Sequence, residues 1–207
     1  PGKSSSRMTR TAVLLLAAGA SSRYEAGDKL LAELKGHTVL EQTAAQVPAS
    51  EFVTRMAVVR SGDDARASVL GSAGWEVVQN HDAETGQSSS LVVGLKAISQ
   101  RADVDQIIVL FADMPLVPSS HLDLMLHRAE AESITAILSA CDGRLSPPAL
   151  FKRVHFDALA ELTGDRGAKA LYLSLERGQE TVPLAKELGV DIDRVEDLIR
   201  LEETENA

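Results

Sequence analysis

Two short apolar runs constrain the fold of this 207-residue chain most strongly, because neither alternates between apolar and polar residues. They lie at residues 11–16 and 106–111. Continuous apolar strands are typical of parallel sheets that are covered by helices on both faces. Residues 88–100 show helical spacing of apolar side chains, and other such segments separate the strand-like runs. The sequence therefore predicts an α/β fold with a mostly parallel sheet between two helical layers.

Further patterns along the chain predict the individual elements. We expect strands at residues 11–16, 52–60, 76–79, 106–111, 133–140 and 180–184. We expect helices at residues 38–46, 63–70, 88–100, 119–131, 156–162, 166–177 and 195–203. Thr38 with Glu41 forms a capping box at the first helix, Gly71 is expected to close the second, and Pro147-Pro148 to interrupt any regular element. We expect one domain over residues 11–203, after a disordered leader or cloning remnant at 1–10.

Composition limits the partners of the chain. The net charge of −9 and the isoelectric point near 5.0 argue against nucleic acid, which needs a basic face. No apolar run reaches the ~20 residues of a membrane helix. Cys141 is the single cysteine, so no internal disulfide can form, which suits a reducing compartment. We therefore expect a cytoplasmic protein that acts on small molecules.

The first predicted strand ends in a turn of small residues that carries two cations. Leu16, Ala17, Ala18 and Gly19 let a ligand approach the backbone, and Ser21, Arg23 and Lys29 follow. Free backbone N–H groups beside Arg and Lys suit a polyphosphate. The turn lacks the glycine and lysine spacing of a Walker loop and the three glycines of a dinucleotide fingerprint. An ordinary loop with surface cations is an equal alternative from these residues alone.

Carboxylates at two further places are candidates for a magnesium site. Asp113 directly follows the apolar run at 106–111, and Asp191 and Asp193 precede the last predicted helix. Ligands of open α/β sheets bind beyond the carboxyl ends of strands, so Asp113 and the Gly19 turn are expected to share one cleft. Mg²⁺ needs one or two carboxylates besides substrate phosphates. A turn or helix cap is the alternative role for each aspartate.

Other polar residues bear on nucleotide binding and metal chemistry. Gln87 and Ser88 begin a predicted helix, where Gln87 is a candidate partner for a base edge and Ser88 a candidate cap or nucleotide contact. The five histidines lack metal-ligand spacing, so no zinc site is predicted. Among them, His121 and His127 are expected on exposed faces of one helix.

Taken in order, these motifs resemble those of the MobA-like nucleotidyltransferases, in the branch of molybdenum-cofactor cytidylyltransferases. The resemblance extends from Thr11 to Leu201. Its six segments are Leu16-Ala17-Ala18-Gly19-x-Ser21-x-Arg23 with Lys29-Leu30-Leu31, Lys35 to Glu41, Gly86 to Leu91 with Gly94-Leu95, Ala112 to Val117, Leu162 to Ala168, and Asp191 to Leu198.

The resemblance implies a Rossmann-like α/β/α domain that transfers a nucleotidyl group and releases pyrophosphate. It implies that Arg23, Lys29 and Asp113 serve catalysis and that Asp113 and Asp193 hold Mg²⁺, with Asp191 as the alternative second ligand. Nucleotide contacts are implied for Leu16, Ala17, Ala18, Gly19, Ser21, Gln87 and Ser88. Ala18, where guanylyltransferase relatives carry glycine, indicates CTP. The implied acceptor is a phosphate such as molybdopterin, with a molybdoenzyme as a further partner.

Two departures from the family pattern keep other functions open. Tyr24-Glu25 stands where relatives usually have Met-Gly, and Ser146-Pro147-Pro148 where they usually have Gly-His-Pro. Transfer to a sugar phosphate or another small phosphate is one alternative. A non-catalytic cofactor-binding protein or chaperone on the same fold is another. An NAD(P)-dependent oxidoreductase is disfavoured, because the dinucleotide glycines are missing.

Overall fold

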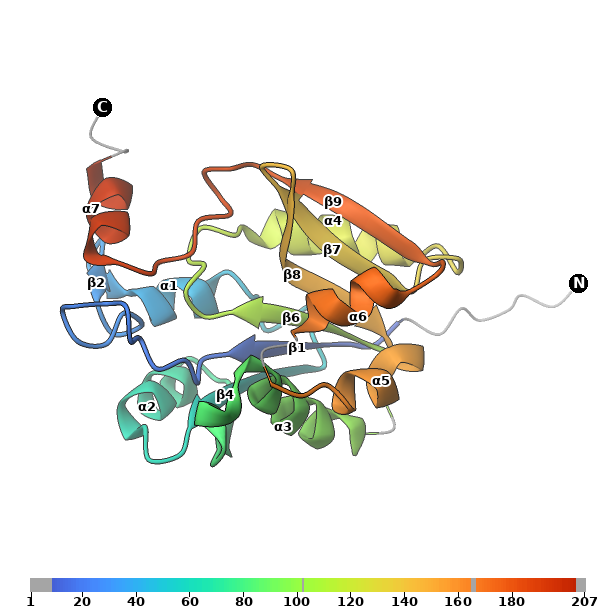
Figure 1. The fold of residues 1–207 in the computed structure, drawn as a ribbon, viewed down its shortest axis with the longest axis horizontal. Coiled ribbons are helices and arrows are strands. Elements are labelled where there is room, and N and C mark those ends of the chain that lie inside the picture. Colours follow the sequence, from blue (N-terminus) through green and yellow to red (C-terminus); the bar gives the residue numbers. More distant parts are fainter. Residues whose placement is uncertain (1–8, 102, 165–166, 204–207) are drawn as a thin grey trace, which may run out of the picture.

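The computed structural model describes residues 9–101, 103–164 and 167–203. Its central sheet has seven strands in the order β5-β4-β1-β6-β8-β7-β9 (Figure 1). The strands are β1 Thr11–Leu16, β4 Thr54–Arg60, β5 Glu76–Asn80, β6 Gln106–Phe111, β7 Ala136–Cys141, β8 Arg144–Lys152 and β9 Gln179–Leu184. A two-stranded ribbon joins β2 Glu33–Leu34 to β3 His37–Thr38. The helices are α1 Val39–Ala45, α2 Asp64–Ser72, α3 Gln87–Ser99, α4 Ser119–Ala129, α5 Phe156–Ala160, α6 Ala168–Ser174 and α7 Val195–Glu203, with 3-10 turns at Ala83–Thr85 and Arg153–His155.

The register of the central strands brings the predicted site segments to one sheet edge. β1 is parallel to both β4 and β6, and Leu16 pairs with Phe111 at the carboxyl ends of β1 and β6. Beyond the strands, the Ala17 N–H donates to Val58 O at 2.8 Å and the Ala112 N–H to Leu16 O at 3.1 Å. The loops that follow β1 and β6 therefore leave the sheet side by side.

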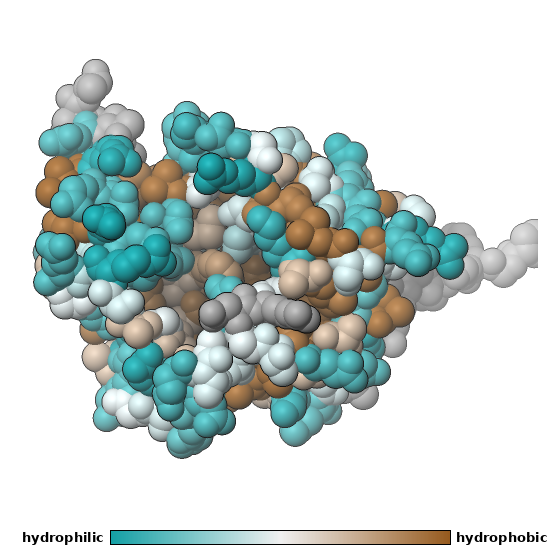
Figure 2. All heavy atoms as spheres, viewed as in Figure 1, coloured by the Kyte–Doolittle hydropathy of each residue, from teal (hydrophilic) through white to brown (hydrophobic). Residues whose placement is uncertain are grey.

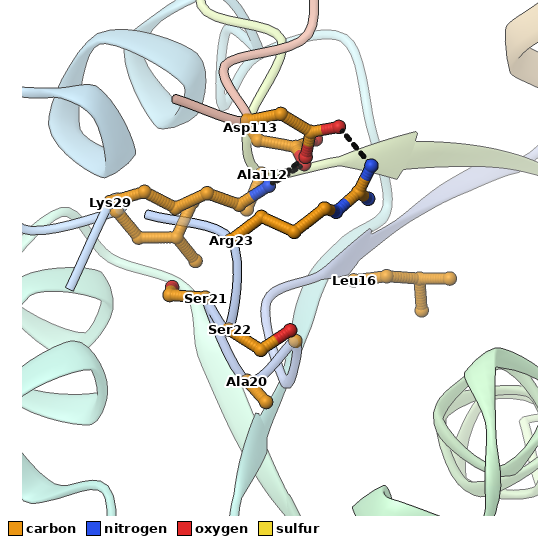
Figure 3. A pocket seen from close by; sticks show the side chains of 11 residues that line it. Leu16, Ala20, Ser21, Ser22, Arg23, Lys29, Ala112 and Asp113 are labelled. Carbon is orange, nitrogen blue, oxygen red and sulfur yellow. Dashed lines mark hydrogen bonds and ion pairs between the residues drawn. The ribbon is translucent and has the colours of Figure 1, made fainter. Parts of the chain in front are cut away.

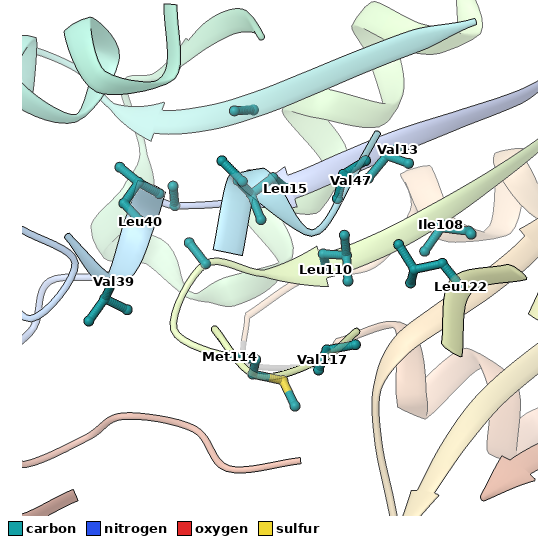
Figure 4. Packing of buried hydrophobic residues seen from close by; sticks show 14 of the residues in the cluster. Val13, Leu15, Val39, Leu40, Val47, Ile108, Leu110, Met114, Val117 and Leu122 are labelled. Atoms are coloured by element: carbon teal, nitrogen blue, oxygen red, sulfur yellow. The ribbon is translucent and has the colours of Figure 1, made fainter. Parts of the chain in front are cut away.

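Alternate residues of the central strands point into two separate cores. Val13 and Leu15 of β1 belong to the cluster covered by α1, α2, α4 and α7 (Figure 4). Leu14 belongs to the opposite cluster, covered by α3, α5 and α6. Because every central strand is apolar on both faces, both faces are covered (Figure 1). The three-layer prediction is confirmed.

Close packing of α3 against the sheet depends on Gly94. A Cβ atom there would overlap the side chains of Leu14 and Val58, so the helix approaches the strands only because this position has no side chain. The first turn of α3, at Gln87, is thereby held beside the carboxyl ends of β1 and β4.

Most predicted elements are present, with three corrections. Pro147-Pro148 does not interrupt regular structure: β8 runs through the pair, antiparallel to β6 and β7, although the β7–β8 register shifts there. Gly71 lies inside α2 and does not close it. His121 is buried, at 6 % exposure, and not on an exposed helix face, whereas His127 is exposed.

Two predicted segments fall partly outside the described residues. These are residues 1–8 of the expected leader and Asp165-Arg166 in the fifth motif and at the start of the helix expected at 166–177. Arg10, which was assigned to the leader, is tied to the fold: its N–H donates to Asp105 Oδ2 at 2.9 Å.

The viewed surface is mainly polar. Figure 2 shows hydrophilic residues over most of this face, with apolar residues in separate patches. Among the described residues, no helix has both the length and the apolar character needed to cross a membrane.

Candidate functional site

The loop after β1 offers a row of free hydrogen-bond donors. In the described chain, the backbone N–H groups of residues 18–23 donate no hydrogen bond. Ala17 and Ala18 are buried, and Ser21 has a positive φ of 52°, which turns the chain back on itself. No described atom lies within 4 Å of a Cβ built at Gly19. Successive unpaired N–H groups around such a turn suit an anion.

Lys29 connects this loop to the two acidic segments. Its Nζ donates to Asp113 Oδ2 at 2.6 Å and to Asp193 Oδ1 at 3.0 Å, with 12 % of the side chain exposed. Burial opposes the charged ammonium, but the two carboxylates outweigh it and hold the pKa of Lys29 above its ordinary value. The predicted meeting of the cationic loop with the acid after β6 is therefore present.

Asp113 retains an unused acceptor in this cluster. Its Oδ1 is buried and has no hydrogen-bond partner within the described ranges. Burial raises the pKa of Asp113 above its ordinary value, against the opposing charge of Lys29. A buried carboxylate oxygen without a partner is costly unless a ligand or ion satisfies it.

Asp193 is delivered by the segment that leads into α7. Ile192 is fully buried and its N–H donates to Asp113 O at 2.9 Å, which ties this segment to the loop after β6. The Asp193 N–H donates to Asp197 Oδ2 at 3.1 Å, and Asp193 Oδ2 pairs with Arg23 Nη1 at 2.8 Å. Asp191 is exposed. The geometry thus favours Asp193 over Asp191 as the second carboxylate.

These side chains surround a pocket at the edge of the sheet. Figure 3 shows Lys29 and Arg23 extending from the loop toward the carboxylates beside Asp113. The pocket is lined by Leu16, Gly19, Ala20, Ser21, Ser22, Arg23, Lys29, Leu30, Ala112, Asp113 and Asp193. We call it the loop pocket. Arg23 is 70 % exposed and therefore free to follow a ligand.

A second chamber continues from the loop pocket toward α3. It shares Leu16, Gly19 and Asp113 with that pocket and adds Ala18, Gln87 and other residues. Ala17 is buried beneath the loop. Ser88 is also buried, and its hydroxyl donates to Gly164 O at 2.6 Å, so its contacts are those of a structural residue. Ser90, which belongs to the motif from Gly86 to Leu91, also lines the chamber, as does Arg60, which the sequence analysis did not single out.

A third, more apolar chamber lies beyond Gln87 and Phe111. Its walls include Val109, Leu138, Leu145, Pro147 and Ala149, with Lys169 at the side. Ser146 and Pro147, one of the two departures from the family pattern, are part of this wall. The other departure lies elsewhere: Tyr24 is buried at 8 % exposure in the core cluster that contains Leu198 and Leu201.

The donor set fits a divalent cation that shares its coordination with a ligand. In the part of the chain that the structure describes, no group of three or more His, Cys, Asp or Glu could hold a metal alone. Asp113 and Asp193 supply two adjacent carboxylates, and Oδ1 of Asp113 is free. Mg²⁺ is usually bound by one or two carboxylates with substrate phosphates, which matches this arrangement.

Arg66 is a further residue near this site that sequence reasoning missed. It lies on α2 and is 4 % exposed, and its guanidinium donates to two backbone carbonyls of the loop after β1. Its partner Asp28 directly precedes Lys29, but no spacing in the sequence relates the two residues. No pattern in the sequence therefore marks Arg66 as part of the site.

Comparison with known proteins places this architecture among the nucleotidyltransferases. The chain belongs to the family of MobA-like NTP transferase domains, whose model matches residues 13–179. The expected family is therefore confirmed.

Particular relatives cover nearly the whole chain. A nicotine blue oxidoreductase of Paenarthrobacter nicotinovorans is 26 % identical over 200 residues, which are 91 % of this chain and 94 % of the relative. The manganese complex of Rv0371c from Mycobacterium tuberculosis H37Rv has a TM-score of 0.76 at 24 % identity, covering 95 % of this chain and all of that one. A nucleotidyl transferase of Methanothermobacter thermautotrophicus has a TM-score of 0.78 at 21 % identity, covering 94 % and 97 %.

Proposed function

We propose that this protein transfers a cytidylyl group from CTP to a phosphate-bearing acceptor of the molybdopterin type and releases pyrophosphate. The observation that carries the proposal is Lys29, held between Asp113 and Asp193 at the mouth of a loop with free N–H groups. Such a cluster binds a triphosphate and stabilises charge that develops during nucleotidyl transfer. The cytidylylated product would then be passed to a molybdoenzyme.

The reaction requires positioning and charge stabilisation more than covalent catalysis. An oxygen of the acceptor phosphate attacks the α-phosphorus, the bond from that phosphorus to the bridging oxygen breaks, and pyrophosphate leaves. The N–H groups of residues 18–23 hold phosphate oxygens, and Lys29 stabilises the charge on the α-phosphate. Arg23, whose fork is exposed, binds the departing pyrophosphate.

Asp113 and Asp193 would hold a divalent cation, Mg²⁺ in our proposal, that neutralises charge on the triphosphate when bound. The manganese complex of the mycobacterial relative supports a metal of this kind. The buried Oδ1 of Asp113 is the acceptor that this role requires.

The positions of the two further chambers support separate places for the nucleotide base and for the acceptor along the cleft. The base lies in the second chamber, where Ala18 and Gln87 face it, and the acceptor lies in the apolar third chamber. The Tyr24-Glu25 departure does not argue against catalysis, because Tyr24 is packed into the core behind the loop.

Pyrophosphate release tests the proposal. The protein is assayed with CTP, GTP, ATP and UTP, each with Mg²⁺, Mn²⁺ or a chelator, against molybdopterin, sugar phosphates and other small phosphates. We expect release with CTP, molybdopterin and metal, and a loss on the order of 10²-fold or more in Lys29→Met and Asp113→Asn. Lys96→Met, on the exposed side of α3, is the matched control. Equal turnover in all three variants would contradict the assignment.

The relative from Paenarthrobacter nicotinovorans supports a second candidate, because an oxidoreductase shares 26 % of its residues with this chain. The apolar third chamber would then receive a quinoid ring, which is reduced as NADH or NADPH is oxidised. Oxidation of NADH or NADPH with a quinoid dye, without pyrophosphate release from any triphosphate, would favour this candidate over transfer.

A further inference from the structure

Arg66 is an almost fully buried arginine whose guanidinium is directed at the nucleotide loop. It belongs to the first turn of α2, where its own N–H is capped by Asp63 Oδ1 at 3.1 Å. The side chain is 4 % exposed. Burying an arginine is costly unless each of its donors finds an acceptor, so its contacts define what it does.

All five guanidinium N–H groups of Arg66 have acceptors, and these five acceptor atoms belong to four residues of the loop. Nη1 donates to Ala17 O at 2.6 Å and to Gly19 O at 2.8 Å. Nη2 donates to Ser21 Oγ at 3.2 Å and to Asp28 Oδ1 at 2.7 Å, and Nε donates to Asp28 Oδ2 at 2.8 Å. One side chain thereby connects the start of the loop, at residues 17–21, with its end at Asp28, next to Lys29.

The two carbonyl contacts determine where the free N–H groups point. In a trans peptide the C=O and the N–H of the same unit point in opposite directions. The unit of Ala17 O contains the Ala18 N–H, and the unit of Gly19 O contains the Ala20 N–H. Because Arg66 takes both carbonyls on one side of the loop, these N–H groups face the other side, where they are without a described partner.

We propose that Arg66 is a positioning residue for the triphosphate: it holds the carbonyls of Ala17 and Gly19 away from the ligand and so presents the N–H groups of the same peptides to it. The inference rests on the proposed function. Arg66 touches no reacting atom and acts through the loop. Asp28, bound in a bidentate pair, closes the same brace next to Lys29.

Lysine cannot replace Arg66 in this role. Its single ammonium has three donors on one nitrogen and lacks the planar fork that reaches two carbonyls and a carboxylate together. Arg66→Lys therefore keeps the positive charge but loses the simultaneous hydrogen bonds to the two carbonyls and the carboxylate. Arg55→Lys is the matched control, because Arg55 also ties backbone carbonyls, at Val47, Ala73 and Gly74, away from the loop pocket.

The experiment compares both variants with the parent in two measurements. Calorimetry measures the affinity for CTP with Mg²⁺, and amide hydrogen exchange in nucleotide-free protein follows Tyr24 and Leu30, whose N–H groups are bonded inside the loop. We expect Arg66→Lys to weaken CTP binding at least tenfold and to speed exchange at both amides. We expect Arg55→Lys to change neither, even where it lowers the melting temperature equally.

Each outcome decides the proposal. Unchanged exchange at Tyr24 and Leu30 in Arg66→Lys, or unchanged CTP affinity, overturns it. If Arg66→Lys does not fold, Asp28→Asn loosens the same brace and is held to the same two criteria. A parent that binds no triphosphate overturns the proposed function, while faster exchange in Arg66→Lys would still show that Arg66 holds the loop.

Discussion

Gly19 lies where the loop pocket and the second chamber meet. It borders both, and a Cβ there would have no described atom within 4 Å. Since its φ is not in the left-handed region, the backbone also accepts alanine. No described part of the protein fills the space beside Gly19, so a ligand can occupy it.

Gly19→Ala should separate folding from binding. We expect unfolding free energy within about 0.5 kcal/mol of the parent, because nothing in the empty protein is displaced. Triphosphate affinity should fall at least tenfold, because the methyl group enters the space beside the free N–H groups. Thermal shift with and without CTP and Mg²⁺ measures both quantities.

Gly71→Ala is the matched control for that substitution. Gly71 lies within α2 in open space, so alanine there should stabilise the protein by about 0.5–1 kcal/mol and leave binding unchanged. Normal CTP affinity in Gly19→Ala would mean that the ligand does not approach the loop at this point.

Single residues differ in how far the sequence reveals them. The meeting of Lys29 with Asp113 could be predicted, because both follow parallel strands whose carboxyl ends share an edge. For Ser88 the ligand contact stays a prediction beside its observed bond to Gly164 O, since a serine that starts a helix gives the same signal whether it caps the fold or binds a ligand. Arg66 gave no signal, because two of its acceptors are backbone carbonyls that any residue would provide and no spacing in the sequence relates it to Asp28.

At the scale of elements, α4 shows that a polar side chain can lie on the buried face of a helix when it has a hydrogen-bond partner there. His121 and Leu122 are both buried against the sheet. His121 Nε2 lies 2.8 Å from Ser139 Oγ, and that hydroxyl donates to Pro148 O at 2.9 Å. The hydroxyl hydrogen is used, so Nε2–H must donate to the serine. This chain of contacts links α4, β7 and β8.

The buried histidine predicts a loss of stability in acid. Burial lowers the pKa of His121 below its ordinary 6.5, so the unfolded chain takes up the proton first. Its contribution is complete above pH 6.5 and declines as the pH falls toward the folded-state pKa. Urea unfolding at pH 7.5 and 5.5 should show a smaller acid loss in His121→Gln than in the parent.

His127→Gln, on the exposed side of the same helix, is the control and should retain the parental difference between the two pH values. An acid loss in His121→Gln as large as in the parent would assign the effect to other groups, such as His155, whose pKa burial also lowers.

The missed strand β8 has a physical explanation at the same scale. Proline cannot donate to a ladder, so two prolines argue against an interior strand. In the structure, Ser146 pairs with Ser139 and Ala149 with Leu138, so Pro147-Pro148 occupy the irregularity between the two registers. The strand keeps its ladder on both sides of the pair. The sequence signals were strongest for the parallel strands, which are apolar on both faces, and weakest here and at the two-residue strands β2 and β3.

At the scale of the whole molecule, the site joins segments from near both limits of the described chain. Arg23 and Lys29 follow the first strand, whereas Asp193 precedes the last helix, α7. Leu198 and Leu201 of α7 belong to the same core cluster as Tyr24, so packing holds the two segments together. In the protein without ligand, Asp193 pairs with both cations of the loop, Arg23 and Lys29, and Asp113 also pairs with Lys29.

This arrangement predicts opposite effects of Asp193→Asn with and without metal. In a chelator, the variant should bind CTP more tightly than the parent, because a competing negative charge is removed from Lys29 and Arg23. With Mg²⁺ it should bind CTP more weakly, because a metal ligand is lost. Calorimetry under both conditions measures the change of sign.

Asp191→Asn makes the same charge change two residues away at an exposed position, and should alter both affinities much less. Equal behaviour of the two variants would mean that the effect comes from overall charge and not from the contacts of Asp193.

The late position of Asp193 has a consequence for synthesis on the ribosome. Strands β5, β4, β1 and β6, together with Lys29, are translated by residue 111, and these parallel strands are mutual neighbours. Domains generally fold as units, so Lys29 can meet Asp193 only after nearly all of the described chain has been translated. A translation product that stops short of residue 193 would contain Lys29 and Asp113 but lack the carboxylate that flanks Lys29 on its other side.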